Sequence, residues 1–329
     1  MNLYRTGAIA SGLLALSSVI GTAHAASSAQ ERYPDKPIRF VLANAPASSA
    51  DILVRILSDR LAEQMKQPVV VDTRPGGSGI IGTAIAKSAP ADGYTLLQAG
   101  NVFTTITALR KDLPFNVDTD FIALTKIAWV ANVLAVYGGL NVNSVPDLIR
   151  LAKAKPNTLN YGSAGIASPS HLSAALLDVL AGIRTVHIPY KGTAQALTDT
   201  MTGQLQFLIT SPLVVAPHAN SGRIRVIATT GPTRDRLFPN LPTVRESVPG
   251  YEMTQWWGVA VPANTPPRIV SKLHEEICKA LQDPDTRSAM AKYGATADPQ
   301  SMAEFAAFIK SERARVGDLI KRAGIAGTE

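Results

Sequence analysis

Hydrophobic and polar positions along the first third of the chain alternate between short apolar runs and segments with helical spacing. The run Ile38 to Ala43 contains β-branched and aromatic residues and is typical of a buried strand. A helix is predicted from Asp51, because the apolar positions after it recur at intervals of four: Leu53, Leu57, Leu61 and Met65. A strand at 69–71, a short helix ending at Lys87 and a strand at 94–98 follow. This alternation predicts a parallel α/β layer.

The middle of the chain repeats the alternation with new members. Strands are predicted at 130–137, 159–162, 185–188, 204–210 and 225–230, and helices at 144–155, 171–180 and 193–202. Ser144 is suited to the cap of its helix, with Pro146 in the first turn. The pattern predicts a second α/β domain.

The end of the chain returns to long amphipathic helices, at 267–281 and 302–323, after a strand at 256–261. We expect these helices to pack on the first domain, so that the chain crosses between domains near 120–130 and again near 250–256. Two crossings imply a hinge and a cleft. The predicted fold class is therefore α/β, with one domain from residues 26–128 and 252–329, a second from 129–251, and an interdomain cleft.

The first 25 residues have the pattern of a secretory signal peptide. Arg5 precedes the uncharged run Gly7 to Gly21, and Ala23 and Ala25 are the small residues before the expected cleavage site. The run is too short and too rich in Ala, Ser and Gly for a typical membrane anchor. No cysteine near the site offers a point for lipid attachment. We expect a soluble protein in the periplasm of a Gram-negative bacterium.

Composition narrows the functional class. With 46% hydrophobic and 17% charged residues the chain is globular, and its formal charge of +7 comes from scattered Lys and Arg, which argues against nucleic-acid binding. The single cysteine, Cys278, falls in a helical apolar pattern and is interpreted as an inert residue. The five histidines lack ligand spacing, so no metal site is predicted.

A G-x-G-x-x-G match at Gly77 to Gly82 raises dinucleotide binding as an alternative. The context is wrong, because Arg74 and Pro75 separate the glycines from the strand and no acidic residue follows at the expected distance. We interpret the segment as a tight structural turn and expect no cofactor.

Two loops of small and polar residues precede predicted helices, at 44–51 and 161–170. Small residues let a ligand approach the backbone, while serine hydroxyls and the free N–H groups of a helix N-terminus suit a carboxylate. Two such loops, one in each domain, suit a single carboxylate in the cleft. Ordinary helix caps explain both loops equally well.

A secreted serine-type hydrolase is an alternative hypothesis, since Ser163 and His171 could be two members of a catalytic triad. The residue two positions before Ser163 is Tyr161, however, so the G-x-S-x-G elbow is absent. Tyr190 follows a predicted strand at the edge where open sheets bind ligands; it either contacts a ligand or packs between strands. Trp256 and Trp257 are expected to anchor the returning strand.

The chain resembles the substrate-binding proteins of tripartite tricarboxylate transporters, also called Bug-type receptors. The resemblance rests on several short sequence motifs that occur in the same order and extend over nearly all of residues 26–329. These motifs are Tyr33-Pro34-x-Lys36-Pro37-Ile38, Arg74-Pro75-Gly76-Gly77-x-Gly79-x-x-Gly82, Asp92 to Leu97, Tyr161-Gly162-Ser163, His171-Leu172, His187 to Gly192 and Leu241-Pro242-Thr243. The resemblance implies a type II-like periplasmic binding protein, without enzymatic activity, that closes on a mono-, di- or tricarboxylate, aromatic ones included. It also implies delivery to a permease with one large and one small membrane subunit. We expect a monomer.

The resemblance also implies which residues hold the ligand. The first loop contributes Ala47, Ser48, Ser49 and Asp51; the second contributes Ser163, Ala164, Ser168 and His171; the expected wall residues are Asn101, Thr104 and Tyr190. The family usually carries two glycines where this chain has Ala47 and Ser48, so we expect the first loop to follow another path. A sensory receptor that signals to a membrane kinase is a further alternative.

Overall fold

The computed structural model describes residues 33–46, 48–190, 192–235 and 238–325. The expected signal peptide, residues 1–25, and the expected ligand residue Ala47 lie outside these ranges.

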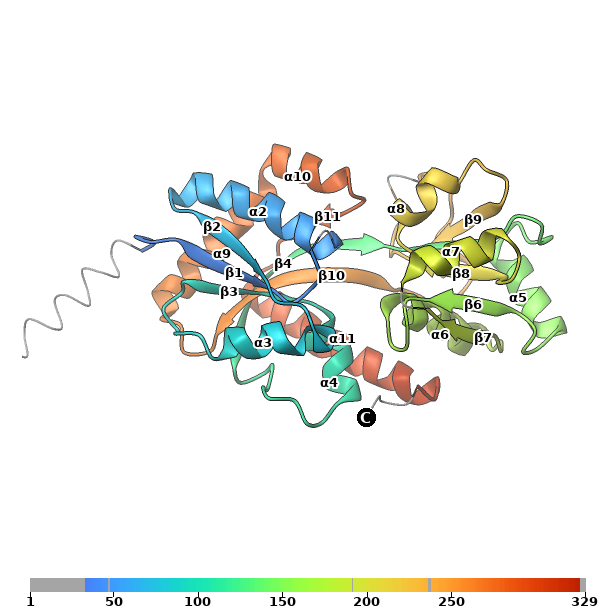
Figure 1. Ribbon diagram of the computed structural model, residues 1–329, viewed down its shortest axis with the longest axis horizontal. Helices are drawn as coiled ribbons and strands as arrows, with labels where there is room; N and C mark the ends of the chain where they lie inside the picture. Colours follow the sequence, from blue (N-terminus) through green and yellow to red (C-terminus); the bar gives the residue numbers. More distant parts are fainter. Residues whose placement is uncertain (1–32, 47, 191, 236–237, 326–329) are drawn as a thin grey trace, which may run out of the picture.

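The described strands form two sheets (Figure 1). The first sheet has the order β11-β4-β10-β3-β1-β2. Its strands are β1 (Ile38–Leu42), β2 (Val69–Thr73), β3 (Thr95–Ala99), β4 (Phe121–Ala131), β10 (Thr254–Pro262) and β11 (Thr296–Ala297). Strands β1, β2 and β3 run parallel, as the strand–helix alternation predicts, and β10 pairs antiparallel with both β3 and β4.

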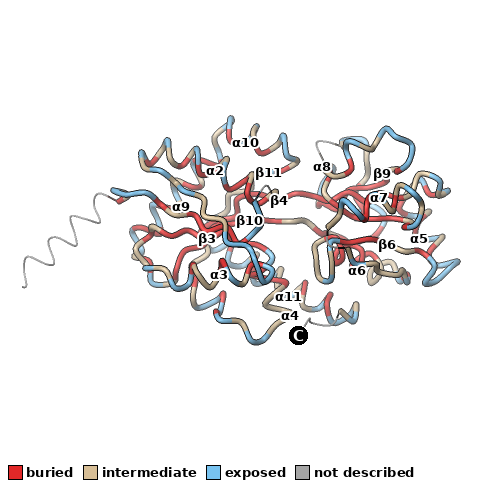
Figure 2. Tube along the Cα trace, viewed as in Figure 1, coloured by how far each residue is buried: buried red, intermediate tan, exposed pale blue. Residues whose placement is uncertain are grey.

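The second sheet has the order β7-β6-β8-β5-β9. Its strands are β5 (Val133–Tyr137), β6 (Asn160–Ser163), β7 (Val186–Pro189), β8 (Phe207–Thr210) and β9 (Ile224–Thr229). Strand β6 is parallel to β7 and β8, whereas β5 is antiparallel to β8 and β9. Each sheet has its own buried core, and Figure 2 shows the two buried regions separately.

Helices cover the faces of both sheets. Around the first sheet these are α2 (Ser49–Met65), α3 (Ile80–Lys87), α4 (Thr105–Leu109), α9 (Pro267–Gln282), α10 (Pro284–Ala291) and α11 (Met302–Arg322); around the second they are α5 (Val145–Ala154), α6 (Pro169–Ala181), α7 (Thr193–Met201) and α8 (Pro212–Val215). Short 3₁₀ turns occur at Gly77–Gly79, Asn101–Phe103, Ala216–His218 and Val244–Glu246.

The chain passes between the sheets where β4 continues into β5 and where β9 leads back to β10 (Figure 1). The crossing strand β4 begins at Phe121, nine residues before the predicted strand. Thr125 and Lys126 interrupt its apolar pattern, yet both are buried, because Lys126 pairs with Asp298 at 2.9 Å and Thr125 bonds to the backbone of Gln300. Residues far along the chain thus make this polar stretch compatible with a strand.

Helix α11 contacts both cores. Phe305 and Ile309 belong to a cluster of the first sheet, as expected for a helix that packs on the first domain. Val316, Leu319 and Ile320 belong to the core of the second sheet. The last turns of the helix therefore bridge the two halves of the molecule, which the periodicity alone did not predict.

Candidate ligand-binding site between the sheets

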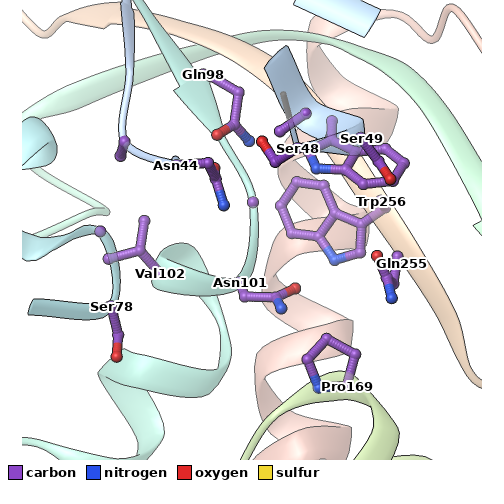
Figure 3. A pocket seen from close by; sticks show the side chains of 15 residues that line it. Asn44, Ser48, Ser49, Ser78, Gln98, Asn101, Val102, Pro169, Gln255 and Trp256 are labelled. Carbon is purple, nitrogen blue, oxygen red and sulfur yellow. The ribbon is translucent and has the colours of Figure 1, made fainter. Parts of the chain in front are cut away.

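A cavity of about 300 Å³ lies between the two halves, at the carboxyl ends of β1 and β3 (Figure 3). Its polar side chains come from four different segments of the chain: Asn44, Ser48, Ser49, Ser78, Gln98, Asn101 and Gln255. Its apolar walls are formed by Ala43, Ala50, Val102, Pro169, Trp256 and Trp257. The site therefore combines polar side chains with an apolar wall, as small-molecule sites do.

The N-terminus of α2 forms one side of the cavity. Ser48 caps the helix with extended backbone (φ −73°), and its hydroxyl accepts a hydrogen bond from the Asp51 N–H at 3.3 Å. The first N–H groups of a helix have no acceptor within the helix, so they offer partial positive charge to this side of the cavity. Ser48 stands at the second of the two glycine positions of the family pattern, and its ordinary φ shows that serine is unstrained there.

The glycine-rich turn before α3 reaches the same cavity. Gly76, Gly77 and Gly79 all have positive φ, as the prediction of a tight turn requires, and Ser78 (φ 55°) shares that region. A Cβ on Gly82 would lie 2.9 Å from Ala43 Cα, so this glycine lets α3 approach the end of β1. The close approach brings Ser78 and Gly79 to the cavity wall.

The end of β3 supplies two amide side chains. Gln98 is buried, and its Nε2 donates a hydrogen bond to the Ala99 carbonyl. A Cβ on Gly100 would lie 2.7 Å from Gln98 Nε2, so a side chain here would push the Gln98 amide aside. Asn101 is exposed to the cavity, and Figure 3 shows it below Trp256 in that view.

Strand β10 forms the aromatic wall. The Trp256 ring packs edge-on against Phe305 and Phe308, with centroids 5.7 and 5.3 Å away. These contacts fix the indole, which is only 2% exposed. Trp256 and Trp257 therefore anchor the strand, as predicted, and also line the cavity.

The second half contributes Pro169, the first residue of α6. Its helix is capped by Ser168, whose hydroxyl accepts a hydrogen bond from the His171 N–H at 3.3 Å. The first residues of α2 and α6 thus lie at the cavity from opposite halves. Among the described lining residues none carries a charged side chain, so recognition of an anion here depends on neutral donors and helix dipoles.

None of the four expected residues of the second loop lines this cavity. Ser163 is fully buried, Ser168 is occupied as a cap, and the backbone N–H of Ala164 donates to Ser170. His171 lines a different cavity, together with Tyr161 and Asp178.

Three other expected residues do not line the cavity either. Asp51 is buried and its carboxylate accepts from Arg55 at 2.8 Å. Thr104 is buried beside α4. The Tyr190 hydroxyl donates to Asp199 at 2.6 Å. The cavity thus brings together Ser48, Ser49 and Asn101 of the residues expected from the sequence.

Ser163 does lie next to a histidine, but to His187 rather than His171. Its Oγ is 2.6 Å from His187 Nε2, and it also donates to the Gly165 carbonyl and accepts from the Gly165 N–H. A fully buried hydroxyl with these partners is closed to a substrate. The pair has the role of an internal contact, not of a hydrolase dyad.

Within the ranges that the structure covers, no three His, Cys, Asp or Glu side chains are grouped as metal ligands. In the same ranges no helix has the length and apolar character needed to cross a membrane.

Two α/β halves joined by crossing strands, with a polar cavity between them, define the class of solute-binding receptors. The model of the tripartite tricarboxylate transporter family receptor matches residues 53–325. The chain belongs to this family, and the expected fold class, the family and the non-enzymatic character are thereby confirmed. Members of the family are periplasmic receptors.

Individual relatives agree with this assignment. A UPF0065 protein of Bordetella bronchiseptica is 34% identical, over 98% of this chain and 94% of its own. Protein BugT of Bordetella pertussis is 31% identical, over 98% and 99%. The solved structure of R. palustris Rpa4515 with adipate is 32% identical, covers 89% of this chain and 99% of its own, and superposes with a TM-score of 0.77.

Sequence reasoning missed part of the cavity. Gln98, Val102 and Gln255 received no functional interpretation, and the glycine-rich turn was interpreted as structural only. The position of Gln98 and Val102 around the carboxyl end of a parallel strand was the signal available for those two, because ligands bind at that edge. Gln255 had no such signal.

Proposed function

We propose that the chain is a receptor that captures a small carboxylate-bearing metabolite in the cavity between its halves. The observation that carries this proposal is the composition of the cavity: uncharged amide and hydroxyl groups and two helix N-termini around an apolar wall. Such donors satisfy a carboxylate without a buried counter-ion. Adipate, with which the related Rpa4515 was solved, is a ligand of this chemical kind.

Residues 26–128 with 252–329 are proposed as one domain and 129–251 as the other, which close about the crossing strands. Asn132 lies at one crossing and Met253 at the other. Closure moves Pro169 toward Asn101 and Ser48 and removes the ligand from water. Residues 1–25 are proposed as a signal peptide that is removed on export, and a two-subunit membrane permease as the recipient of the ligand.

The test is a thermal-shift screen of mono-, di- and tricarboxylates, aromatic acids included, followed by calorimetry with adipate. A ligand that binds only the folded protein raises its melting temperature. The absence of any shift at ligand concentrations far above micromolar would contradict the proposal.

A matched pair of variants locates the site. Asn101→Ala removes an amide from the cavity wall, whereas Asn220→Ala removes an exposed amide distant from it. We expect the first to weaken binding about tenfold, the value of one or two hydrogen bonds, and the second to leave it unchanged. Equal affinities would place the ligand elsewhere.

A further inference from the structure

The loop 163–170, which ends at the N-terminus of α6 beside the cavity residue Pro169, holds an unfavourable backbone conformation. Gly165 (φ 112°) and Ala167 (φ 58°) both have positive φ. For alanine this region is disfavoured by its Cβ, so contacts from outside must stabilise it.

Two histidines supply those contacts at the two ends of the loop. The Ala167 N–H donates to His171 Nδ1 at 2.9 Å. At the other end, His187 Nε2 lies 2.6 Å from the Oγ of Ser163, the same oxygen that accepts the Gly165 N–H at 3.1 Å. Each of the two positive-φ residues is therefore bonded to a histidine directly or through one hydroxyl.

The two imidazole rings are stacked on each other. Their centroids are 3.8 Å apart and their planes differ by 7°. Tyr161 packs against His187 at 5.1 Å and against Phe207 at 5.3 Å. Phe207 is fully buried in the core of the second sheet, so a cluster of rings connects the loop to that core.

The hydrogen bond that His171 accepts requires its ring to be neutral. Because His171 Nδ1 accepts a hydrogen bond, the proton of the neutral ring is on Nε2. Two imidazolium ions at this separation would repel each other. The partly buried Asp178 carboxylate accepts from the Thr185 N–H and hydroxyl, not from either histidine.

We propose that His171 and His187 are positioning residues for ligand binding: stacked on each other, they hold the loop 163–170 in the conformation that presents Pro169 and the N-terminus of α6 to the cavity. Neither ring lines that cavity. The predicted effect on ligand affinity rests on the proposed function, whereas the predicted effect on the loop conformation does not.

Conservative and non-conservative variants separate this role from simple packing. His187→Gln keeps a polar atom near the position of Nε2, and His171→Asn keeps an acceptor near that of Nδ1. His187→Leu and His171→Leu fill similar space without those atoms. Ser163→Ala removes the contact from the loop side and leaves both rings in place, so it serves if a histidine variant does not fold.

The measurement is amide hydrogen exchange of Gly165 and Ala167 in the ligand-free protein, with adipate calorimetry on the same samples. We expect His187→Leu and Ser163→Ala to speed exchange at Gly165 about tenfold, and His171→Leu to do so at Ala167, with adipate affinity reduced by a similar factor. The Gln and Asn variants should stay within about threefold of the original protein.

The positioning role would be overturned if the Leu and Ala variants exchanged no faster than the original protein. It would also be overturned if exchange became as fast in the Gln and Asn variants as in the Leu variants. Faster exchange with unchanged adipate affinity would overturn its link to the ligand. If the unmodified protein does not bind adipate at all, that ligand fails for the proposed function, while the exchange rates still decide whether the histidines hold the loop.

Discussion

The Thr230 hydroxyl accepts a hydrogen bond from the backbone N–H of Asn132, at 2.8 Å, at the point where β4 becomes β5. The same hydroxyl donates to the Met253 carbonyl at 2.6 Å, just before β10. One buried side chain thus joins both crossings between the halves. Thr230 therefore ties the two crossings to each other.

Thr230→Val should destabilise the protein by about 1–3 kcal/mol, because it leaves a buried N–H and a buried carbonyl without this partner. The neighbouring Thr229 is equally buried, but its hydroxyl has no partner among the described residues. Thr229→Val is therefore a matched control, expected to be neutral or slightly stabilising. Denaturant unfolding of both variants measures the difference. Equal midpoints would show that the junction adds no stability.

Two glycines should respond to alanine in opposite directions. In Gly82→Ala the new Cβ meets Ala43 and the Arg74 carbonyl at 2.9 Å, so α3 must move away from β1, with a loss of about 1–3 kcal/mol and weaker ligand binding. In Gly317→Ala the nearest atom outside α11 is 3.9 Å away. That variant should gain about 0.5–1 kcal/mol from helix propensity. Thermal unfolding compares the two; a stable Gly82→Ala protein would contradict the close approach.

Adipate affinity should depend weakly on salt. Since no charged side chain lines the described part of the cavity, there is no exposed ion pair for salt to screen. Between about 50 and about 500 mM NaCl we expect a change of less than about threefold in the dissociation constant. Calorimetry at both concentrations is sufficient, and a change of tenfold or more would indicate a charged residue in direct contact with the ligand.

Acidification should destabilise the folded protein through His171, which lies in its second half. Burial, together with the neighbouring His187, lowers the pKa of His171 to about 4. Between about pH 6.5 and pH 4 the unfolded chain therefore binds a proton at this histidine that the folded protein does not bind. The free energy of unfolding falls as the pH drops through this range. The loss is on the order of 1–2 kcal/mol at pH 5. His171→Asn should reduce it in melting curves recorded at pH 7 and pH 5.

Asp178 should have the opposite effect on the pH dependence of stability over part of the same pH range. Burial raises its pKa to about 6, against the effect of the hydrogen bonds from Thr185. The folded protein then binds the proton more readily than the unfolded chain, so this group favours folding below about pH 6 and costs stability above it. Asp178→Asn should therefore steepen the loss of melting temperature between pH 7 and pH 5, whereas His171→Asn flattens it. The same change in both variants would contradict these assignments.

The sequence by itself determined the class of fold and the family. Periodicity is a local property: four-residue spacing identifies α2, and Ser48, Ser144 and Ser168 take the cap positions that precede α2, α5 and α6. The family motifs are likewise strings of adjacent residues. The polar loop at the N-terminus of α2 lines the cavity with Ser48 and Ser49, and its contact with a ligand stays a prediction.

The tertiary structure decided which polar groups line the cavity and which bond to other groups inside the protein. His171 and Ser163 have the right chemistry for a site, but the register of β6 with β7 places Tyr161 beside His187 and leaves Ser163 within reach of it. Gln255 reaches the cavity only because β10 returns next to β3 after more than 150 residues. Such contacts depend on strand order and on the path of the chain between the halves, and neither is encoded in local spacing.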